Sequence, residues 1–401
     1  MTVAPDPRRR FVVIAAIGVG QILAWGSSYY LLAVLAGPVV RATGWPGAWV
    51  IGAFSLGLLT SGLVSPRVGH LIERFGGRPV LAASSVLLAV GLLMLAAAPN
   101  LAVFVAAWLV IGVGMGAGLY DPAFSTLGRL YGEHARSAIT QLTLFGGFAS
   151  TVCWPLSALF VEQFGWRGAS LAYAAINVTV VLPLYLLGVP REQQRLPPVR
   201  LADTPHAPAR WHRAGDRSAF VTLALGLTVA SVIMTVISVY VLVLLQARGL
   251  TLAAAVSLGA LIGPSQVGAR VLEAAIGRRY HPIWSLLVST TAVAVGLGML
   301  LGSASIVGAG LVLYGSGSGI RSIARGTVPL ALFGRDGYAV LMGRLAMPIL
   351  IAQAASPLLG ALLVGHLGPD ATIAVLTGVA VFNILLVLPL VPLALRRPIA
   401  A

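Results

Sequence analysis

Four arginines fall within apolar segments of this chain, where a permanent charge needs a physical reason. Arg270 follows Gln266 by one helical turn, so both side chains would share one face of a helix. Arg321 and Arg325 are also one turn apart, and they follow "YGSGSGI", whose small residues permit either close helix packing or a bent backbone. A guanidinium group forms parallel hydrogen bonds with a carboxylate, so these three arginines are candidate ligands for an anionic group. The fourth, Arg344, is interpreted as an anchor at a helix end.

Arg270 also has two explanations that involve no ligand. Its side chain would reach the membrane interface if it extended toward Gly277, about 10 Å away along a helix. It would also lie near Glu273, three residues further on, and would form a local ion pair there.

Asp121 is the one acidic residue expected deep within an apolar segment of the N-terminal half. A shift of the sequence by 202 residues aligns it with Ile323, midway between Arg321 and Arg325. Three interpretations are open: an ion pair between the halves that acts as a gate, a carboxylate that carries a coupled proton, and a structural pair that fixes helix packing.

Neutral polar and aromatic side chains complete the set of candidate binding residues. Gln21, Trp25 and Ser28 are spaced to lie on one face of a helix. Three tyrosines come from separate apolar segments: Tyr120, Tyr240 and Tyr314. A phenol donates a hydrogen bond and offers an apolar ring, although each of these aromatic residues would also serve packing alone. Several arginines beside a single deep acid favour a small, organic, anionic substrate.

The composition decides where these residues must lie. Hydrophobic residues make up 58% of the 401 residues and charged residues 9%, and the mean hydropathy is +0.94. Such a chain is an integral membrane protein, and its long apolar stretches indicate helices. A single cysteine, Cys153, excludes disulfides within the chain and cysteine-based metal sites. The six histidines are scattered, and no cluster of catalytic residues is evident, so we expect no enzyme activity, no metal and no cofactor.

Apolar windows between charged or Gly/Pro breaks predict twelve transmembrane helices. Their approximate ranges are 11–40, 46–66, 79–98, 101–128, 138–163, 168–189, 218–246, 252–276, 282–302, 304–333, 338–365 and 370–394. The first of these is expected to be an uncleaved span rather than a signal peptide. A polar stretch divides the spans into an N-terminal bundle (1–190), a cytoplasmic central loop (191–217) and a C-terminal bundle (218–401).

Internal repetition supports two related halves. The shift by 202 residues brings Leu130-Tyr131-Gly132 over Leu332-Phe333-Gly334, and Pro155 over Pro357. The prediction is an all-α membrane protein with twelve transmembrane helices in two pseudo-symmetric six-helix bundles.

The net charge of +15 is interpreted as a signal of membrane topology. With the N-terminus inside, 19 of the arginines fall in inner segments and three in outer segments, namely Arg41, Arg167 and Arg248. The positive-inside rule then places both termini and the central loop in the cytoplasm, and a bacterial inner membrane is expected. The partners expected are the lipid bilayer and a small molecule, without nucleic acid, and the chain is expected to be a monomer.

The segment "GHLIERFGGRPVL" (69–81) resembles the signature between helices 2 and 3 of the major facilitator superfamily. Gly69, Glu73, Arg74 and Arg78 carry the match, with Glu73 where aspartate is usual. Gly69 would let two helices approach, while Glu73 and the arginines would form a charge cluster that breaks and re-forms during gating. The resemblance implies a transporter fold in which helices 1, 4, 7 and 10, with parts of helices 5, 8 and 11, line the cavity.

A second, shorter motif narrows the resemblance. "QVGAR" (266–270) is similar to the helix-8 signature of the monocarboxylate transporters, in which an aspartate precedes the arginine by four residues. Arg270 matches that arginine and Gln266 replaces the aspartate, which leaves proton coupling open. The helix-1 motif of that family is not evident in "GQILAWGSSYY", and "TLFGGFASTVCWPLSALF" lacks the G-P-x-x-G-G pattern of proton-coupled drug antiporters.

The leading hypothesis is therefore a secondary transporter of a small, carboxylate-like solute that works by alternating access. An efflux pump for drugs or another toxic solute is the alternative within transport. A receptor or scaffold with a transporter fold is a further alternative, although the longest predicted loop has only about 27 residues.

Overall fold

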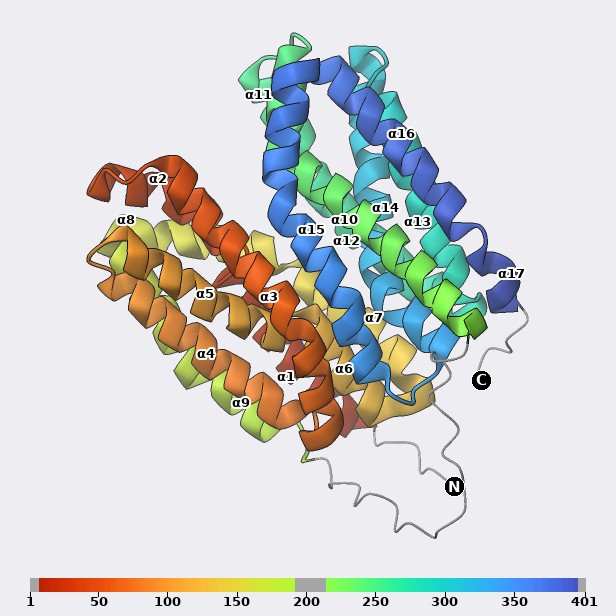
Figure 1. Ribbon diagram of the computed structural model, residues 1–401, viewed down its shortest axis with the longest axis horizontal. Helices are drawn as coiled ribbons and strands as arrows, with labels where there is room; N and C mark the ends of the chain where they lie inside the picture. The colour runs from red at the N-terminus through yellow and green to blue at the C-terminus, as the bar shows by residue number, and fades with distance from the viewer. Residues whose placement is uncertain (1–6, 192–213, 396–401) are drawn as a thin grey trace. The chain divides into compact units, whose positions relative to one another are not determined.

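The computed structural model describes residues 7–191 and 214–395, and all regular structure within these ranges is helical (Figure 1). Most of the predicted central loop, residues 192–213, lies outside the described residues. The chain divides into two compact units. Unit 1 comprises Met1–Ala207 and Gly337–Leu350, and unit 2 comprises Pro208–Asp336 and Ile351–Ala401.

Unit 1 is built from helices whose small residues allow close packing. They are α1 (Pro7–Gly26), α2 (Leu31–Thr43), α3 (Gly47–Phe75), α4 (Gly77–Ala97), α5 (Leu101–Gly118), α6 (Tyr120–Tyr131), α7 (Ala135–Gly147), α8 (Ala149–Ile176), a π-helical segment Asn177–Val181, and α9 (Leu182–Gly188). In Figure 1, α4 and α5 run side by side in this unit. A Cβ atom on Gly112 of α5 would overlap the carbonyl of Gly57 on α3, so these two backbones are in direct contact.

Unit 2 repeats this construction. Its helices are α10 (Ala214–Ala247), α11 (Leu252–Gly259), α12 (Ile262–Ile276), α13 (Pro282–Met299), α14 (Ala304–Phe333), α16 (Pro369–Val387) and α17 (Leu390–Leu395). α15 (Tyr338–Leu367) begins in unit 1 and continues in unit 2. α13 and α14 meet at Gly296 and Gly310, where a Cβ atom on either residue would lie within 2.8 Å of the other's carbonyl oxygen.

Five predicted spans contain a break in the helix, among them 138–163 at Phe148 and 370–394 after Val387. The first span stops at Gly26 and resumes at Leu31, and the four residues between them form turns. The span 101–128 is interrupted at Leu119, whose extended backbone (φ −81°, ψ −157°) separates α5 from α6. The span 252–276 is interrupted between Gly259 and Ile262. Broken helices at such positions expose backbone groups that can serve a binding site.

The internal repeat is visible where helices end. Gly132 ends α6 with φ 54°, and Gly334, its counterpart under the shift by 202 residues, ends α14 with φ 80°. Two further pairs of left-handed glycines have nearly the same offset: Gly44 with Gly249, and Gly165 with Gly368. Glycine adopts a positive φ without a steric penalty, so both halves use it at equivalent turns.

Nine stretches of the described residues are long and apolar enough to cross a membrane. One of them, Ala135–Gly188, is 54 residues long and contains a non-helical turn at Gly165 (φ 68°), so it has room for two crossings. α14 and the broken pair of α11 and α12 are not among these nine stretches, which are selected by length and mean hydropathy. The chain is a multi-pass helical membrane protein, and the count of twelve spans stays a prediction.

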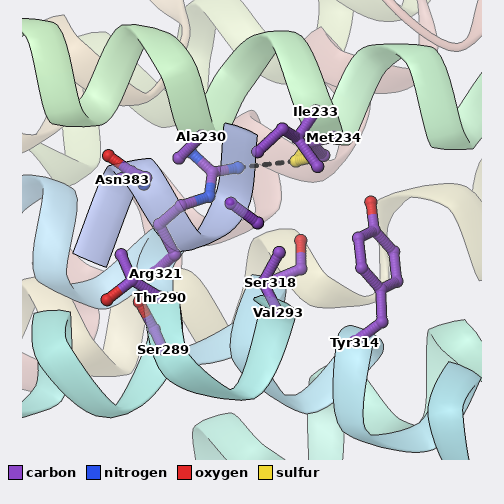
Figure 2. A pocket seen from close by; sticks show the side chains of 11 residues that line it. Ala230, Ile233, Met234, Ser289, Thr290, Val293, Tyr314, Ser318, Arg321 and Asn383 are labelled. Carbon is purple, nitrogen blue, oxygen red and sulfur yellow. Dashed lines mark hydrogen bonds between the residues drawn. The ribbon is translucent and has the colours of Figure 1, made fainter. Parts of the chain in front are cut away.

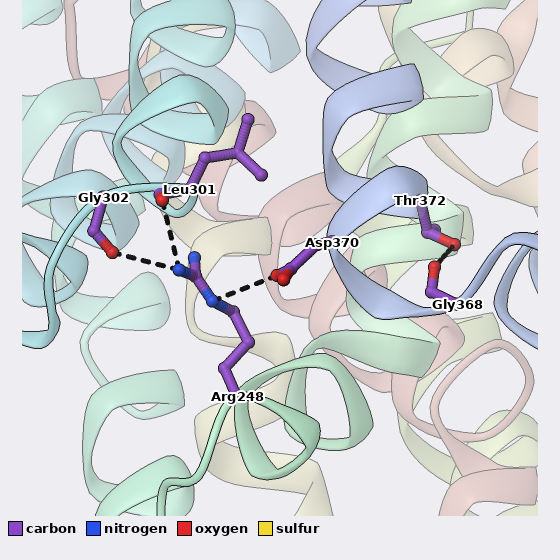
Figure 3. A network of polar contacts seen from close by, with 6 residues as sticks. All are labelled: Arg248, Leu301, Gly302, Gly368, Asp370 and Thr372. Atoms are coloured by element: carbon purple, nitrogen blue, oxygen red, sulfur yellow. Dashed lines mark hydrogen bonds and ion pairs between the residues drawn. The ribbon is translucent and has the colours of Figure 1, made fainter.

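At one end of unit 2, Arg248 connects three helices (Figure 3). Its Nη2 atom donates to the carbonyl oxygens of Leu301 and Gly302, both at 3.1 Å, just after α13. Its Nε atom lies 3.2 Å from an Asp370 carboxylate oxygen at the start of α16. In unit 1, Arg167 donates to the carbonyl of Ala98 at 2.8 Å, just after α4. Two of the three arginines predicted to lie on the outer side of the membrane thus bind carbonyl groups at a helix C-terminus.

Candidate functional site

In unit 1, the side chain of Gln21 on α1 forms hydrogen bonds near two helix breaks, the one after α1 and the one between α5 and α6. Its side chain is fully buried, and its Nε2 atom donates to the carbonyl oxygen of Gly118, the last residue of α5, at 2.6 Å. Its Oε1 atom accepts a hydrogen bond of 3.2 Å from the indole nitrogen of Trp25. The amide therefore satisfies an otherwise free carbonyl at the α5 terminus and fixes the orientation of the indole ring.

Trp25 lies at the centre of an aromatic cluster, defined here as Trp25, Tyr29, Tyr30, Phe54, Tyr120 and Trp154. The Trp25 ring centroid is 5.1 Å from that of Tyr29, 5.9 Å from Tyr30 and 5.1 Å from Tyr120. Sequence reasoning placed only Trp25 and Tyr120 in the site. The run "WGSSYY" was a usable signal, because serines and paired tyrosines after a tryptophan mark the break that brings these rings together.

Asp121 lies beside Tyr120 in the first turn of α6 and is 8% exposed. The buried ring of Tyr338, at the start of α15 and in the same unit, packs over Gly128 of α6. The predicted ion pair of Asp121 with the arginines of α14 stays a prediction.

The motif residues 69–78 lie at the end of α3 and the start of α4. A Cβ atom on Gly69 would come within 2.5 Å of the Ala339 carbonyl oxygen, so α3 and the start of α15 are in backbone contact. Glu73 forms an ion pair of 2.9 Å with Arg129 near the end of α6. Of the motif arginines, Arg74 is exposed with its guanidinium over the ring of Phe75, and Arg78 is half-buried. Sequence reasoning missed Arg129 as the partner of Glu73, since the two are distant in the chain.

In unit 2, Arg270 of α12 is 6% exposed, and its Nε atom donates to the carbonyl oxygen of Gly319 on α14 at 3.4 Å. A Cβ atom on Gly319 would overlap the carbonyl of Gln266, so α12 and α14 are in direct contact beside the arginine. Gln266 itself is half-buried. A side chain this buried does not extend to an interface, which argues against the snorkelling interpretation. Glu273, its other proposed neighbour, accepts a hydrogen bond of 2.6 Å from Ser285.

Arg321 is directed into a pocket between α10, α13, α14 and α16 (Figure 2). Its guanidinium donates to Ser231 Oγ at 3.4 Å and to Met234 Sδ at 2.6 Å, both on α10. Tyr314 and Asn383 also line this pocket, which encloses about 10 Å³, room for about one water molecule. Sequence reasoning missed Ser231, Met234 and Asn383, because nothing in their local pattern separates them from packing residues.

The remaining candidates of unit 2 have simpler surroundings. Arg325 is half-buried one turn beyond Arg321. Tyr314 is 3% exposed within the hydrophobic core of the unit. The hydroxyl of Tyr240 donates to the carbonyl of Pro357 at 2.8 Å, which supports the packing interpretation for that tyrosine.

Helices that break beside buried polar residues, in two units with repeated helix ends, are typical of secondary membrane transporters. The particular family follows from the sequence: the profile of the Major Facilitator Superfamily matches residues 17–324, and the chain belongs to this superfamily. The predicted superfamily and the all-helical fold class are thereby confirmed. The members of this superfamily are transporters rather than enzymes.

Individual relatives agree with this assignment. The chain is 31% identical to human monocarboxylate transporter 11 over 161 residues, which is 37% of this chain and 32% of that protein. The matched region thus spans about a third of that relative's length. Among solved structures, the human organic anion transporter MFSD10 (TETRAN) has a TM-score of 0.76 and 19% identity, covering 95% of this chain and 100% of that one. The proton:xylose symporter XylE has a TM-score of 0.72 and 12% identity, with 96% of each chain covered. These two structures show the shared fold alone.

Proposed function

We propose that the chain is a secondary transporter of a small organic carboxylate, and that Arg270 binds the carboxylate group. The observation that carries this proposal is the position of Arg270: a permanently charged side chain, almost fully buried within a predicted transmembrane segment and oriented by the Gly319 carbonyl. A charge within the bilayer costs at least about 2.5–3.5 kcal/mol, so its retention calls for a use. A carboxylate ligand supplies the opposite charge and accepts two parallel hydrogen bonds from one guanidinium.

The comparisons support the same substrate class. The human relative is named as a monocarboxylate transporter, and one structural neighbour is named as an organic anion transporter. Arg270 stands at the position that matches the arginine of the monocarboxylate transporter signature. Gln266 and the half-buried Arg325 are the further candidates for binding the anionic group in unit 2, and Arg321 positions α10 against α14.

Transport is proposed to proceed by alternating access of two bundles, 1–190 and 218–401, joined by the loop 191–217. The contact of Gly69 with α15 would close one side of the pathway, and the ion pair of Glu73 with Arg129 would hold α3 against α6 within the first bundle. Asp121 is the candidate for a coupled proton, and the neighbour XylE is named as a proton symporter. The proposed setting is a monomer in the bacterial inner membrane with both termini in the cytoplasm.

The test is uptake by proteoliposomes that contain the full chain. Wild-type protein is expected to accumulate at least one of labelled acetate, lactate and phenylacetate with saturable kinetics. Arg270→Gln is expected to lower uptake at least thirtyfold, because removing one partner of a buried charged pair costs about 2–5 kcal/mol. Arg279→Gln is the matched control: this arginine is exposed and lies just beyond the same helix, so uptake should persist.

Two results would contradict the proposal. Saturable uptake by Arg270→Gln at the wild-type rate would remove the arginine from the binding site. Uptake of none of the three carboxylates by the wild-type protein would remove the substrate class.

A further inference from the structure

The pocket around Arg321 lies wholly within unit 2 and is separate from the surroundings of Arg270 (Figure 2). Tyr314, Ser318 and Arg321 line it from α14, and their spacing places them on one face of that helix. Gly319, which accepts the hydrogen bond from Arg270, lies on a different face of α14, against α12. The pocket is therefore a second buried site in this unit, with a charge of its own.

Three side chains of this pocket carry hydrogen-bond donors. Arg321 is 6% exposed, and the two groups that it contacts on α10 are neutral acceptors, a hydroxyl and a thioether. Ser318 is buried on the same helix face, and its hydroxyl forms no hydrogen bond with another described residue. Asn383 of α16 is 2% exposed, and its amide likewise forms no hydrogen bond within the described part of the chain. Buried polar groups are normally hydrogen-bonded, so these side chains indicate a ligand in the pocket.

The chemistry of these groups favours an anion over a water molecule. Among the described residues that line the pocket none is acidic, and one carries a permanent positive charge. A Cβ atom on Gly226 of α10 would lie 3.3 Å from Asn383 Oδ1, so this oxygen packs against α10 and leaves the N–H groups of the amide for the pocket. An anion accepts hydrogen bonds from all three side chains, whereas a water molecule would also need acceptors for its own protons. The low dielectric of a buried site strengthens the attraction between a guanidinium group and an anion.

The size of the pocket limits the anion to a single atom. The pocket encloses about 10 Å³, which is room for about one water molecule. A carboxylate, sulfate or phosphate has several heavy atoms and does not fit this volume. A halide ion is close to a water molecule in size, and the flexible side chain of Met234 beside Arg321 can move to give it the remaining room.

We propose that this pocket binds a chloride ion, held by the guanidinium of Arg321, the hydroxyl of Ser318 and the amide of Asn383. These groups come from α14 and α16, and Arg321 also contacts α10, so the bound ion links three helices of unit 2. The site is independent of the proposed carboxylate site, because it requires neither Arg270 nor the transported substrate.

The first experiment measures the thermal stability of the purified full chain in detergent, in a chloride-free buffer to which sodium salts are added at matched ionic strength. Chloride and bromide are expected to raise the melting temperature with saturable dependence on concentration, because each binds only the folded protein. Gluconate, methanesulfonate and acetate are expected to leave it unchanged, since each has several heavy atoms. Equal shifts with all of these salts would show an effect of ionic strength and would overturn the proposal. A shift with acetate alone, or with none of the salts, would also overturn it.

The second experiment locates the ion. Ser318→Ala and Asn383→Leu are each expected to weaken chloride binding at least about tenfold, because each removes a hydrogen bond to a charged ligand. Ser322→Ala is the matched control, since the Ser322 hydroxyl donates to the Gly319 carbonyl on the same helix at 2.7 Å and is not part of the pocket. Arg321→Gln is expected to abolish the chloride response, and the two milder variants carry the test where it does not fold. An unchanged response in Ser318→Ala and Asn383→Leu would overturn the proposal.

The third experiment identifies the occupant directly. Crystals of the full chain grown in sodium bromide are expected to show an anomalous diffraction peak in the pocket beside Arg321. Ordered density there without an anomalous signal would identify a water molecule and would overturn the proposal.

Discussion

Arg248 offers the sharpest test of how unit 2 is held together. Its guanidinium makes two kinds of contact at once: hydrogen bonds to the carbonyl groups of Leu301 and Gly302, and an ion pair with Asp370. The Arg248 side chain is 22% exposed, whereas that of Asp370 is 73% exposed. The two contacts therefore lie in different surroundings, and their contributions to stability should differ.

The expected magnitudes follow from those exposures. A hydrogen bond from a charged group to a carbonyl contributes about 1.5–3 kcal/mol when partly buried, and a cation near a helix C-terminus adds about 0.3–1 kcal/mol. An ion pair with a carboxylate as exposed as Asp370 contributes about 0–1 kcal/mol because water and salt screen it. We expect Arg248→Met to lower the free energy of unfolding by about 2 kcal/mol and Asp370→Asn to lower it by about 0.5 kcal/mol.

The measurement is unfolding of the purified protein from mild detergent micelles by titration with dodecyl sulfate, at low and at high salt. High salt should remove the effect of Asp370→Asn and leave most of the effect of Arg248→Met. In the double variant, the loss should equal that of Arg248→Met alone. If the two single variants lose the same free energy, the ion pair is the main contact and the reasoning about carbonyl binding is wrong.

Two further predictions concern the gating and coupling residues. Gly69→Ala is expected to destabilise the protein by about 1–3 kcal/mol and to lower uptake, because the new Cβ atom would meet the Ala339 carbonyl oxygen at 2.5 Å. Gly52→Ala on the same helix has no neighbour within 4 Å, and in the same thermal-shift measurement it should be neutral or stabilising by about 0.5–1 kcal/mol; equal destabilisation by both would refute the contact. Asp121→Asn is expected to abolish uptake driven by an imposed pH gradient while leaving exchange of labelled substrate, and Glu162→Gln, an exposed carboxylate of the same unit, should retain both. Wild-type flux that ignores the pH gradient would exclude Asp121 as a proton carrier.

The first and last residues of a helix could be predicted from the sequence where the apolar segment and the helix end at the same residue. The range 304–333 coincides with α14, and the outer limits of 252–276 coincide with those of α11 and α12. The span 46–66 was predicted too short, since α3 continues to Phe75. Hydropathy marks the segment that suits lipid, whereas backbone hydrogen bonding continues through the polar turn that follows.

Hydropathy could not predict the breaks within helices, because the residues on both sides of a break are equally apolar. Leu119 is an ordinary apolar residue, and the carbonyl of Gly118 beside its extended backbone accepts a hydrogen bond from Gln21, which is distant in the chain. The ion pair of Glu73 with Arg129 could not be predicted either, because the two residues are distant in the chain. Contacts between distant segments depend on the packing of whole helices, and periodicity along one helix does not contain that information.

The glycine run before Arg321 shows how local sequence and distant packing combine. Its small residues left two explanations open, a bent backbone or close packing, and α14 is one continuous helix across them. A Cβ atom on Gly315 would lie 2.8 Å from the Ile262 carbonyl oxygen of α12, and one on Gly317 would lie 2.6 Å from the Ser289 carbonyl oxygen of α13.

The alternating glycines thus admit one helix on each side of α14. Gly319 continues the row that faces α12, and its carbonyl oxygen accepts the hydrogen bond from Arg270. A side chain at Gly319 would push α12 away and displace the arginine that is proposed to bind the carboxylate. The run of small residues in α14 therefore has a functional consequence, since it sets the position of a charge on the neighbouring helix.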